Sequence, residues 1–227
     1  MQSSAALVLL PHRVIPGTLA ATMTSPPEDR RAPHEDTVLT QRCVAGDRAA
    51  QDELFTAYRA RVHATLYRLL RSNAPMDDLV QEAFLNVFRS LRIYRGESSL
   101  ATWIDRCTVR VAFAWIAQRK AHPPPLELVQ DVPAGDPSAE RRMLAREAAR
   151  HFFAALAKLD PKLRVAFTLH ALDGRPLAEV AHLMDSTLVA TKTRVWRARR
   201  VLSDLALKDP VLASFVQDGA RDGEEVA

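Results

Sequence analysis

The sequence is poor in glycine, in aromatic residues and in cysteine. It has 7 glycines in 227 residues, and aromatic residues make up 6% of the chain. Both shortages argue against a sheet-rich protein, so an all-α fold is expected. Cys43 and Cys107 are the only cysteines, and they lie far apart in the sequence. This argues against a disulfide framework or a Cys-x-x-Cys metal site, and it favours a reducing cytoplasm.

The sequence also lacks a long apolar run. No run reaches the roughly 18 residues that cross a bilayer, so we expect no membrane insertion. Residues 5–10 are apolar, but the stretch is brief, has no positive region before it and is followed by Pro11. These features argue against a secretory signal peptide, so a cytoplasmic location is expected. Whether translation starts at Met1 or at Met23 stays open.

The composition that remains is typical of a soluble globular protein, with 48% hydrophobic and 26% charged residues. A chain of this length is long for one typical domain and short for two large ones. We therefore expect two small helical domains with tails. The formal net charge is +4 and the sequence pI is about 9.4.

Helical periodicity begins near Asp47, a plausible N-cap, and apolar residues then recur at spacings of one, three and four. A second helix is predicted at about 76–91, and a third follows the loop at 94–99, whose serines can cap it. These three helices form the predicted first domain, residues 37–120. The Ser-, Thr- and Pro-rich residues 1–36 are expected to be a disordered extension.

Prolines interrupt the chain between residues 121 and 137, where neither helix nor strand can propagate, so a flexible linker is predicted there. Further helical patterns fill residues 138–208, the predicted second domain, and residues 209–227 are a predicted tail. Within this domain, Asp160 and Pro161 read as an N-cap and a first helical residue.

A helix-turn-helix is predicted near the end of the second domain. Apolar residues at 177, 180, 181 and 184 give a short helix one buried stripe, and residues 185–187 form a turn. A second helix keeps an apolar row through Thr191 and Val195 and carries basic residues on its opposite face. A basic run alone fits a solvated helix face equally well. The short helix, the tight turn and the second basic helix together favour DNA binding.

Several segments, in order and spacing, resemble the extracytoplasmic function class of bacterial sigma factors. The resemblance runs from about residue 39 to residue 207. It is carried by residues 45–50 (Ala-Gly-Asp-Arg-Ala-Ala), 77–84 (Asp-Asp-Leu-Val-Gln-Glu-Ala-Phe), 94–103 (Tyr-Arg-Gly-Glu-Ser-Ser-Leu-Ala-Thr-Trp), 159–167 and 179–199. It implies two domains, sigma region 2 and sigma region 4, and the function of a transcription initiation factor.

The resemblance implies a helix that docks on the clamp helices of core RNA polymerase. The implied polymerase-binding residues are Asp77, Asp78, Leu79, Gln81, Glu82 and Phe84. Another interpretation is that the two aspartates favour a helix N-terminus while Leu79 and Phe84 belong to the core. Since the apolar residues cannot all face outward, we assign the contact mainly to Asp78, Gln81 and Glu82.

The resemblance also implies contacts with the minus 10 element and with melted DNA. The implied residues are Arg95, Gly96, Glu97, Ser98, Arg106, Arg110, Trp115, Gln118, Arg119 and Lys120. Capture of an unstacked base needs a polar pocket and aromatic or cationic surfaces, which the loop at 95–99 and the helix after it can supply. Trp103 falls on the face of Cys107 and Val111 and is assigned to the core, so Trp115 is the better stacking candidate.

The helix-turn-helix is implied to recognise the minus 35 element. The implied contacts are Thr187, Val189, Ala190, Lys192, Thr193, Arg194, Trp196, Arg197 and Arg200. Three positions depart from the family pattern: Asp185 stands where glycine is usual in the turn, Thr191 falls on the buried row, and Pro176 replaces a capping hydroxyl. The base contacts therefore stay open.

Two other functions compete with this interpretation. A stand-alone helix-turn-helix regulator explains the second domain equally well, but it has no need of a melting-like loop in the first. A metal-dependent hydrolase would need ligand spacing that His151, His170 and His182 do not show. We expect no enzyme activity, no cofactor and no metal. The implied partners are core RNA polymerase, promoter DNA and an anti-sigma factor, and the free protein is expected to be a monomer.

Overall fold

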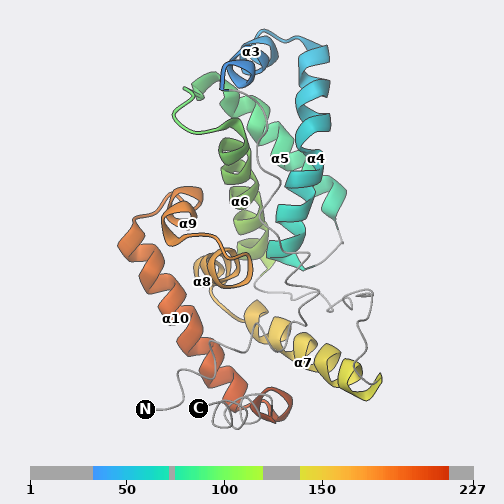
Figure 1. Cartoon of the computed structure of the whole chain (residues 1–227), viewed down its shortest axis with the longest axis vertical. Coiled ribbons are helices and arrows are strands. Elements are labelled where there is room, and N and C mark those ends of the chain that lie inside the picture. The colour runs from blue at the N-terminus through green and yellow to red at the C-terminus, as the bar shows by residue number, and fades with distance from the viewer. Residues whose placement is uncertain (1–32, 72–74, 120–138, 215–227) are drawn as a thin grey trace, which may run out of the picture.

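The fold is all-α. We describe it from a computed structural model in which residues 33–71, 75–119 and 139–214 are described. Every regular element in these ranges is a helix, which confirms the predicted fold class (Figure 1). The elements are α3 (Pro33–Val44), α4 (Arg48–Leu70), α5 (Met76–Ser90), η1 (Leu91–Ile93), α6 (Leu100–Arg119), α7 (Ala139–Ala157), α8 (Pro161–Phe167), η2 (Thr168–Leu172), α9 (Leu177–Leu183) and α10 (Leu188–Leu207).

The helix α3 was not predicted, and it begins four residues before the expected domain start at residue 37. Its own residues give little amphipathic signal, so its position depends on contacts with the rest of the domain. Leu39 and Cys43 are buried in the core. Asp36, which is 3% exposed, accepts a hydrogen bond from the backbone N–H of Leu100 at the start of α6 (3.4 Å).

The helices α4, α5 and α6 pack together as predicted, with α6 in contact with both of the others. The predicted caps form: Asp47 accepts from the Ala50 N–H at 3.2 Å, and the Ser99 hydroxyl accepts from the Thr102 N–H at 3.2 Å. Each cap satisfies a backbone donor that the first helical turn leaves unpaired. Buried leucines and valines such as Leu54 and Val62 then fill the space between the helices.

A second apolar cluster lies between α7, α8 and α10. Phe152 and Leu156 from α7 meet Phe167 from α8 and Leu202 from α10. Asp160 caps α8 through the Lys162 N–H at 3.0 Å, as predicted. The helix continues as the π-helical segment η2, which the sequence patterns did not indicate.

The predicted helix-turn-helix consists of α9, a turn and α10. The residues on the inner row of α10 are buried, including Thr191 at 0% exposure. The Thr187 hydroxyl caps α10 by accepting from the Ala190 N–H at 3.2 Å. Asp185 has φ 48°, in the left-handed region, and Pro176 provides no side-chain cap to α9. The departures from the family pattern at Asp185 and Pro176 therefore have local structural consequences.

The helix-turn-helix half packs directly on the first half of the chain. Val165 and Leu169, together with Val180 and Leu183 from α9, belong to the same apolar cluster as the helices α3 to α6. Both α8 and α9 lie against α6 (Figure 1). Sequence patterns indicated two units and did not predict this packing. The predicted linker at 121–137 lies outside the described residues, as do residues 1–32 and 215–227 of the predicted tails.

Candidate nucleic-acid interface

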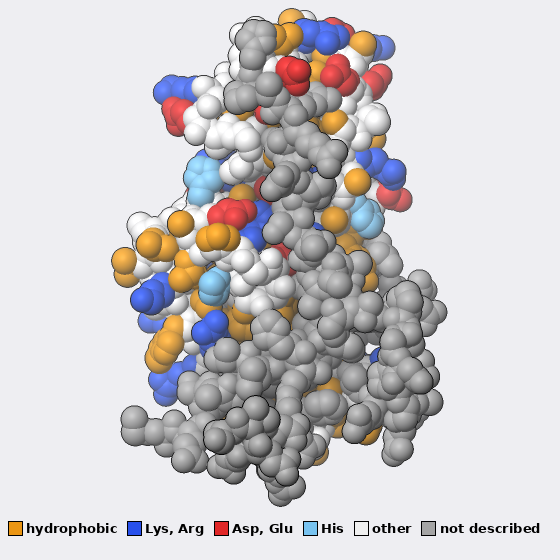
Figure 2. Space-filling model, viewed as in Figure 1, with side chains coloured by type: hydrophobic (Ala, Val, Ile, Leu, Met, Phe, Trp, Pro, Cys, Tyr) orange, Lys and Arg blue, Asp and Glu red, His pale blue; other side chains and the backbone are white. Residues whose placement is uncertain are grey.

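The exposed face of α10 carries most of the residues predicted to contact the minus 35 element. Seven of them are exposed: Thr187, Val189, Lys192, Thr193, Trp196, Arg197 and Arg200. Ala190 and Arg194 are half-buried, and Arg194 donates to the Ser186 hydroxyl at 2.7 Å. Figure 2 shows Lys and Arg side chains mixed with hydrophobic ones along the left edge of the molecule, over α10. A helix with this face can neutralise phosphates and still offer small side chains to base edges.

The exposed face also carries large apolar side chains, among them Val189 and Trp196. Val189 is 76% exposed near the start of α10, and Trp196 is 58% exposed two turns later. The guanidinium of Arg200 lies 5.8 Å from the Trp196 ring centroid, within the range of a cation–π contact. These exposed groups lie beside the cations and not in the core, so the face offers both charge and apolar contact to a partner.

The loop at 94–99, predicted to act in melting, is held by hydrogen bonds at both ends. The Tyr94 hydroxyl donates to the Ser98 carbonyl at 2.7 Å, and Gly96 adopts φ 74°. Tyr94 packs edge-on against Trp103, with ring centroids 5.4 Å apart. Trp103 is half-buried and donates from its indole N–H to the Ser90 hydroxyl at 3.0 Å, in keeping with its assignment to the core. The conformation of this loop is therefore fixed by contacts within the chain.

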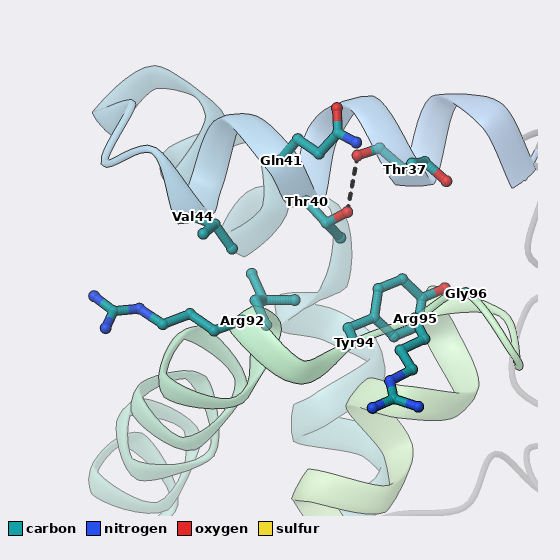
Figure 3. A pocket seen from close by; sticks show the side chains of 9 residues that line it. Thr37, Thr40, Gln41, Val44, Arg92, Tyr94, Arg95 and Gly96 are labelled. Atoms are coloured by element: carbon teal, nitrogen blue, oxygen red, sulfur yellow. Dashed lines mark hydrogen bonds between the residues drawn. The ribbon is translucent and has the colours of Figure 1, made fainter.

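An open cavity with a volume of about 400 Å³ lies between this loop and α3. Arg95 and Gly96 line one side, and Thr37, Thr40 and Gln41 from α3 line the other (Figure 3). The cavity thus has threonine and glutamine side chains on its α3 side and the Tyr94 ring on its loop side, while the Arg95 guanidinium points away from α3 (Figure 3). The α3 side of the cavity was not predicted, because no helix was expected at residues 33–44. Glu97 and Ser98 do not line it.

Two predicted cations on α6 face the helix-turn-helix. Arg106 and Arg110 both bind the carboxylate of Asp185, with Arg110 Nη2 2.7 Å and Nε 2.9 Å from Oδ2. Burial lowers the pKa of Arg106, and the neighbouring charge of Arg110 lowers it further. These two arginines, which were predicted to bind DNA, are therefore paired with a carboxylate of the same chain.

The other residues predicted to contact minus 10 DNA lie toward the end of α6, away from the 94–99 loop at its start. Trp115 is half-buried and packs against the core, which limits it as a stacking platform. Gln118 is exposed. Arg119 ends the helix, but its side chain lies outside the described residues, as does Lys120.

The predicted polymerase-binding residues on α5 separate into two faces. Asp77, Asp78, Gln81 and Glu82 are exposed, while Leu79 and Phe84 are only 4% and 3% exposed. The inclusion of Leu79 and Phe84 among the contact residues is therefore corrected: they belong to the core, and the Phe84 ring packs 4.6 Å from that of Phe55. Leu85 was missed, although it is 46% exposed one turn after Glu82.

The described residues contain no group of three or more His, Cys, Asp or Glu side chains that could hold a metal ion. His151 pairs instead with Asp209 (2.7 Å), and His170 bonds the Arg175 carbonyl (2.9 Å). Cys43 and Cys107 are free and buried. Across the described part of the chain, no helix is both long and apolar enough to span a membrane.

Comparison with known proteins gives two family matches. Residues 54–122 match sigma-70 region 2, and residues 152–202 match sigma-70 region 4. Over 178 residues the chain is 30% identical to the extracytoplasmic function RNA polymerase sigma-E factor of Haemophilus influenzae, covering 74% of this chain and 94% of that protein. The Escherichia coli K12 sigma-E factor is also 30% identical, over 74% and 93%. A solved structure of the sigma factor RpoE with the anti-sigma factor NepR from Bartonella quintana aligns with a TM-score of 0.47 and 20% identity, covering 70% and 97% of the two chains.

Proposed function

The chain belongs to the extracytoplasmic function class of sigma-70 factors, and we propose that two separate surfaces divide promoter recognition between them. As a sigma factor, it is a transcription initiation factor that directs RNA polymerase to promoters. The domains that carry these surfaces are proposed to span residues 37–120 and 138–208. The alternative of a stand-alone regulator is not favoured, because both sigma regions are present in one chain.

The minus 35 element is assigned to α10. Lys192, Arg197 and Arg200 are exposed cations that can contact phosphates on both sides of a major groove. Val189 and Thr193 lie nearer the start of the helix, where recognition helices approach base edges. Arg194 supports the turn through Ser186, so its role is to position α10 as well as to add charge.

The minus 10 element is assigned to the cavity beside Arg95 and Gly96 and to the arginines of α6. A base that leaves the stack needs hydrogen-bond partners on its edges and a surface for its ring. The cavity supplies Thr37 and Gln41 for the edges and the Tyr94 ring for the face, and the Arg95 guanidinium, which points away from α3, adds positive charge beside it. Arg106 and Arg110 lie on the helix that follows this loop and supply charge for the backbone.

Core polymerase is assigned to the exposed face of α5. Asp78, Gln81 and Glu82 present acidic and amide groups, and Leu85 adds an apolar contact. Acidic groups beside an apolar one suit a basic helical partner. Leu79 and Phe84 support this face from beneath by fixing α5 to the core.

The other properties follow from family membership and are part of the proposal. We expect no catalytic activity, a cytoplasmic location, a monomeric free protein and control by an anti-sigma factor. The buried free cysteines Cys43 and Cys107 agree with a reducing compartment.

The exposed cationic face of α10 carries the DNA-binding part of the proposal most directly, and a gel shift tests it. Wild-type protein is mixed with promoter duplex, with and without core polymerase. We expect a specific complex only with polymerase, which Arg197→Ala weakens. Lys208→Ala is the matched control, because it removes one exposed cation just beyond the end of α10. Specific binding of equal strength without polymerase would favour the stand-alone regulator.

A further inference from the structure

The turn of the helix-turn-helix is bound to α6 through one carboxylate. Asp185 accepts from Arg106 through Oδ1 and from Arg110 through Oδ2, at 2.7 Å for Arg110 Nη2. The two arginines are four residues apart and so lie on successive turns of one helix face. Arg106 is also 6.0 Å from the Trp103 ring centroid. One acidic group thus draws two guanidinium groups toward the turn.

Residue 185 is an aspartate although its backbone conformation favours glycine. Its φ of 48° is one that glycine adopts freely and that other residues adopt only at a cost. The backbone of the turn is fixed by hydrogen bonds from the Ser186 N–H to the Ala181 carbonyl (2.9 Å) and from the Asp185 N–H to the His182 carbonyl (3.3 Å). The aspartate therefore contributes a carboxylate that the turn itself does not require.

We propose that Asp185 is an autoinhibitory latch, which holds the helix-turn-helix on α6 and occupies Arg106 and Arg110 when the protein is free. The proposal rests on the assignment of these arginines to minus 10 DNA. A phosphate and the Asp185 carboxylate compete for the same N–H donors, so the closed arrangement and DNA binding by α6 exclude one another.

The latch lies at the accessible edge of a larger contact, which makes it the part that opens first. The Asp185 side chain is 36% exposed and that of Arg110 is 54% exposed. Deeper in the same contact, the Asp105 and Arg175 side chains are 1% and 4% exposed. Exposed ion pairs are weak and are screened by salt, whereas buried pairs are screened much less. Polymerase or DNA can therefore reach this ion pair first, and its loss raises the fraction of molecules in which the two halves separate.

The test uses the full-length free chain and two measurements. Energy transfer between dyes on cysteines introduced at the exposed positions Asp52 and Lys208 reports how far the two halves separate. Fluorescence anisotropy reports the Kd for a fork DNA with a single-stranded minus 10 element. The variants are Asp185→Asn and Asp185→Gly, both of which suit the left-handed backbone. The control is Asp204→Asn, which removes the same charge from an exposed site on α10.

Both Asp185 variants are expected to lower energy transfer and to bind the fork DNA about threefold or more tightly than Asp204→Asn, because a larger fraction of molecules is competent to bind. Energy transfer and affinity equal to those of Asp204→Asn would overturn the proposal. Opening without tighter binding would also overturn it, since the arginines would then not be masked.

A separate assay tests whether Arg106 and Arg110 act on minus 10 DNA, independently of the role proposed for Asp185. Arg106→Gln and Arg110→Gln are tested for promoter opening with core polymerase. Normal opening by both variants would contradict the minus 10 assignment, while the energy transfer of Asp185→Asn would still decide whether the carboxylate holds the halves together.

Discussion

Asp105 on α6 and Arg175 in the loop before α9 form an ion pair of 3.0 Å in which both side chains are almost fully buried. Asp105 also accepts from Arg61 of α4 at 2.9 Å, and Arg175 donates to Glu179 at 2.7 Å. The pair therefore joins the bundle that carries the loop and cavity to the helix that precedes the recognition helix. It is the interior counterpart of the exposed Asp185 contact.

Replacing Asp105 with Ala should destabilise the folded protein strongly. The change leaves Arg175 and Arg61 in the interior without their shared carboxylate, and the loss of one partner from a buried ion pair costs about 3–5 kcal/mol. Urea unfolding monitored by circular dichroism measures the effect. Asp77→Ala is the control, because that side chain is 94% exposed and should change stability by about 0.5 kcal/mol or less. Similar small losses for both variants would contradict the structural role of Asp105.

Replacing Gly96 with Ala should impair promoter melting more than it impairs folding. Gly96 has φ +74° and an added Cβ would meet no atom within 4 Å, so the cost is backbone strain alone, about 1–2 kcal/mol. Gly46 is a matched control, with φ +87° and equally open space. Both Ala variants should lose similar stability, and only Gly96→Ala should reduce open-complex formation in permanganate footprinting. Equal open-complex formation would argue against the loop assignment.

Replacing Glu82 with Ala should weaken binding to core polymerase by about fivefold, equivalent to about 1 kcal/mol, without changing the melting temperature. The side chain is exposed on α5 and is not part of the core. Phe84→Ala provides the contrast, because loss of its buried ring should cost about 3–5 kcal/mol of stability. Titration with labelled core polymerase and thermal melting separate the two effects. Unchanged binding by Glu82→Ala would remove this residue from the contact surface.

Replacing Lys192 with Ala should reduce the salt dependence of promoter binding by the holoenzyme. Loss of one phosphate contact lowers the slope of log affinity against log salt by about one. The measurement is a filter-binding series over several salt concentrations. Val201→Ala, at an exposed apolar position on the same helix, should leave the slope unchanged. A Lys192→Ala slope equal to that of wild type would place this cation away from the phosphates.

The carboxyl of Asp173 should make stability fall as pH rises. Burial raises its pKa above the ordinary 3.8, although Arg68, Arg175 and Arg71 act in the opposite direction. Because the folded state holds this proton more tightly than the unfolded chain, stability from this group is full below pH 3.8 and declines as pH rises through the folded pKa. The unfolding free energy of wild type minus that of Asp173→Asn, measured between about pH 3 and pH 7, should fall as pH rises, because only the wild-type protein has this carboxyl to ionise. A rise of this signed difference with pH would mean that the arginines outweigh burial.

Local signals in the sequence predicted local structure well. Asp47 and Asp160 were predicted as caps, and both form the expected hydrogen bonds, because a cap depends on residues within three positions of itself. The buried Thr191 and the exposed Trp196 followed from helical spacing alone. The buried and exposed faces of α10 could therefore be predicted from the sequence alone.

Features that depend on distant residues were missed. The helix α3 carries few apolar residues, and it is positioned by contacts such as that of Asp36 with Leu100, 64 residues away. The pairing of Arg106 with Asp185 spans 79 residues and joins two predicted domains. The family pattern identified Asp185 as unusual, but it carried no information on what the carboxylate contacts.

The central claim is that this chain initiates transcription by dividing promoter recognition between α10 and the loop and cavity near Arg95. Run-off transcription with core polymerase on a promoter library tests it most directly. Wild-type protein should select promoters that share a minus 35 and a minus 10 element, and Arg197→Ala should reduce initiation from them. Failure of the wild-type protein to support initiation from any promoter in the library would contradict the account.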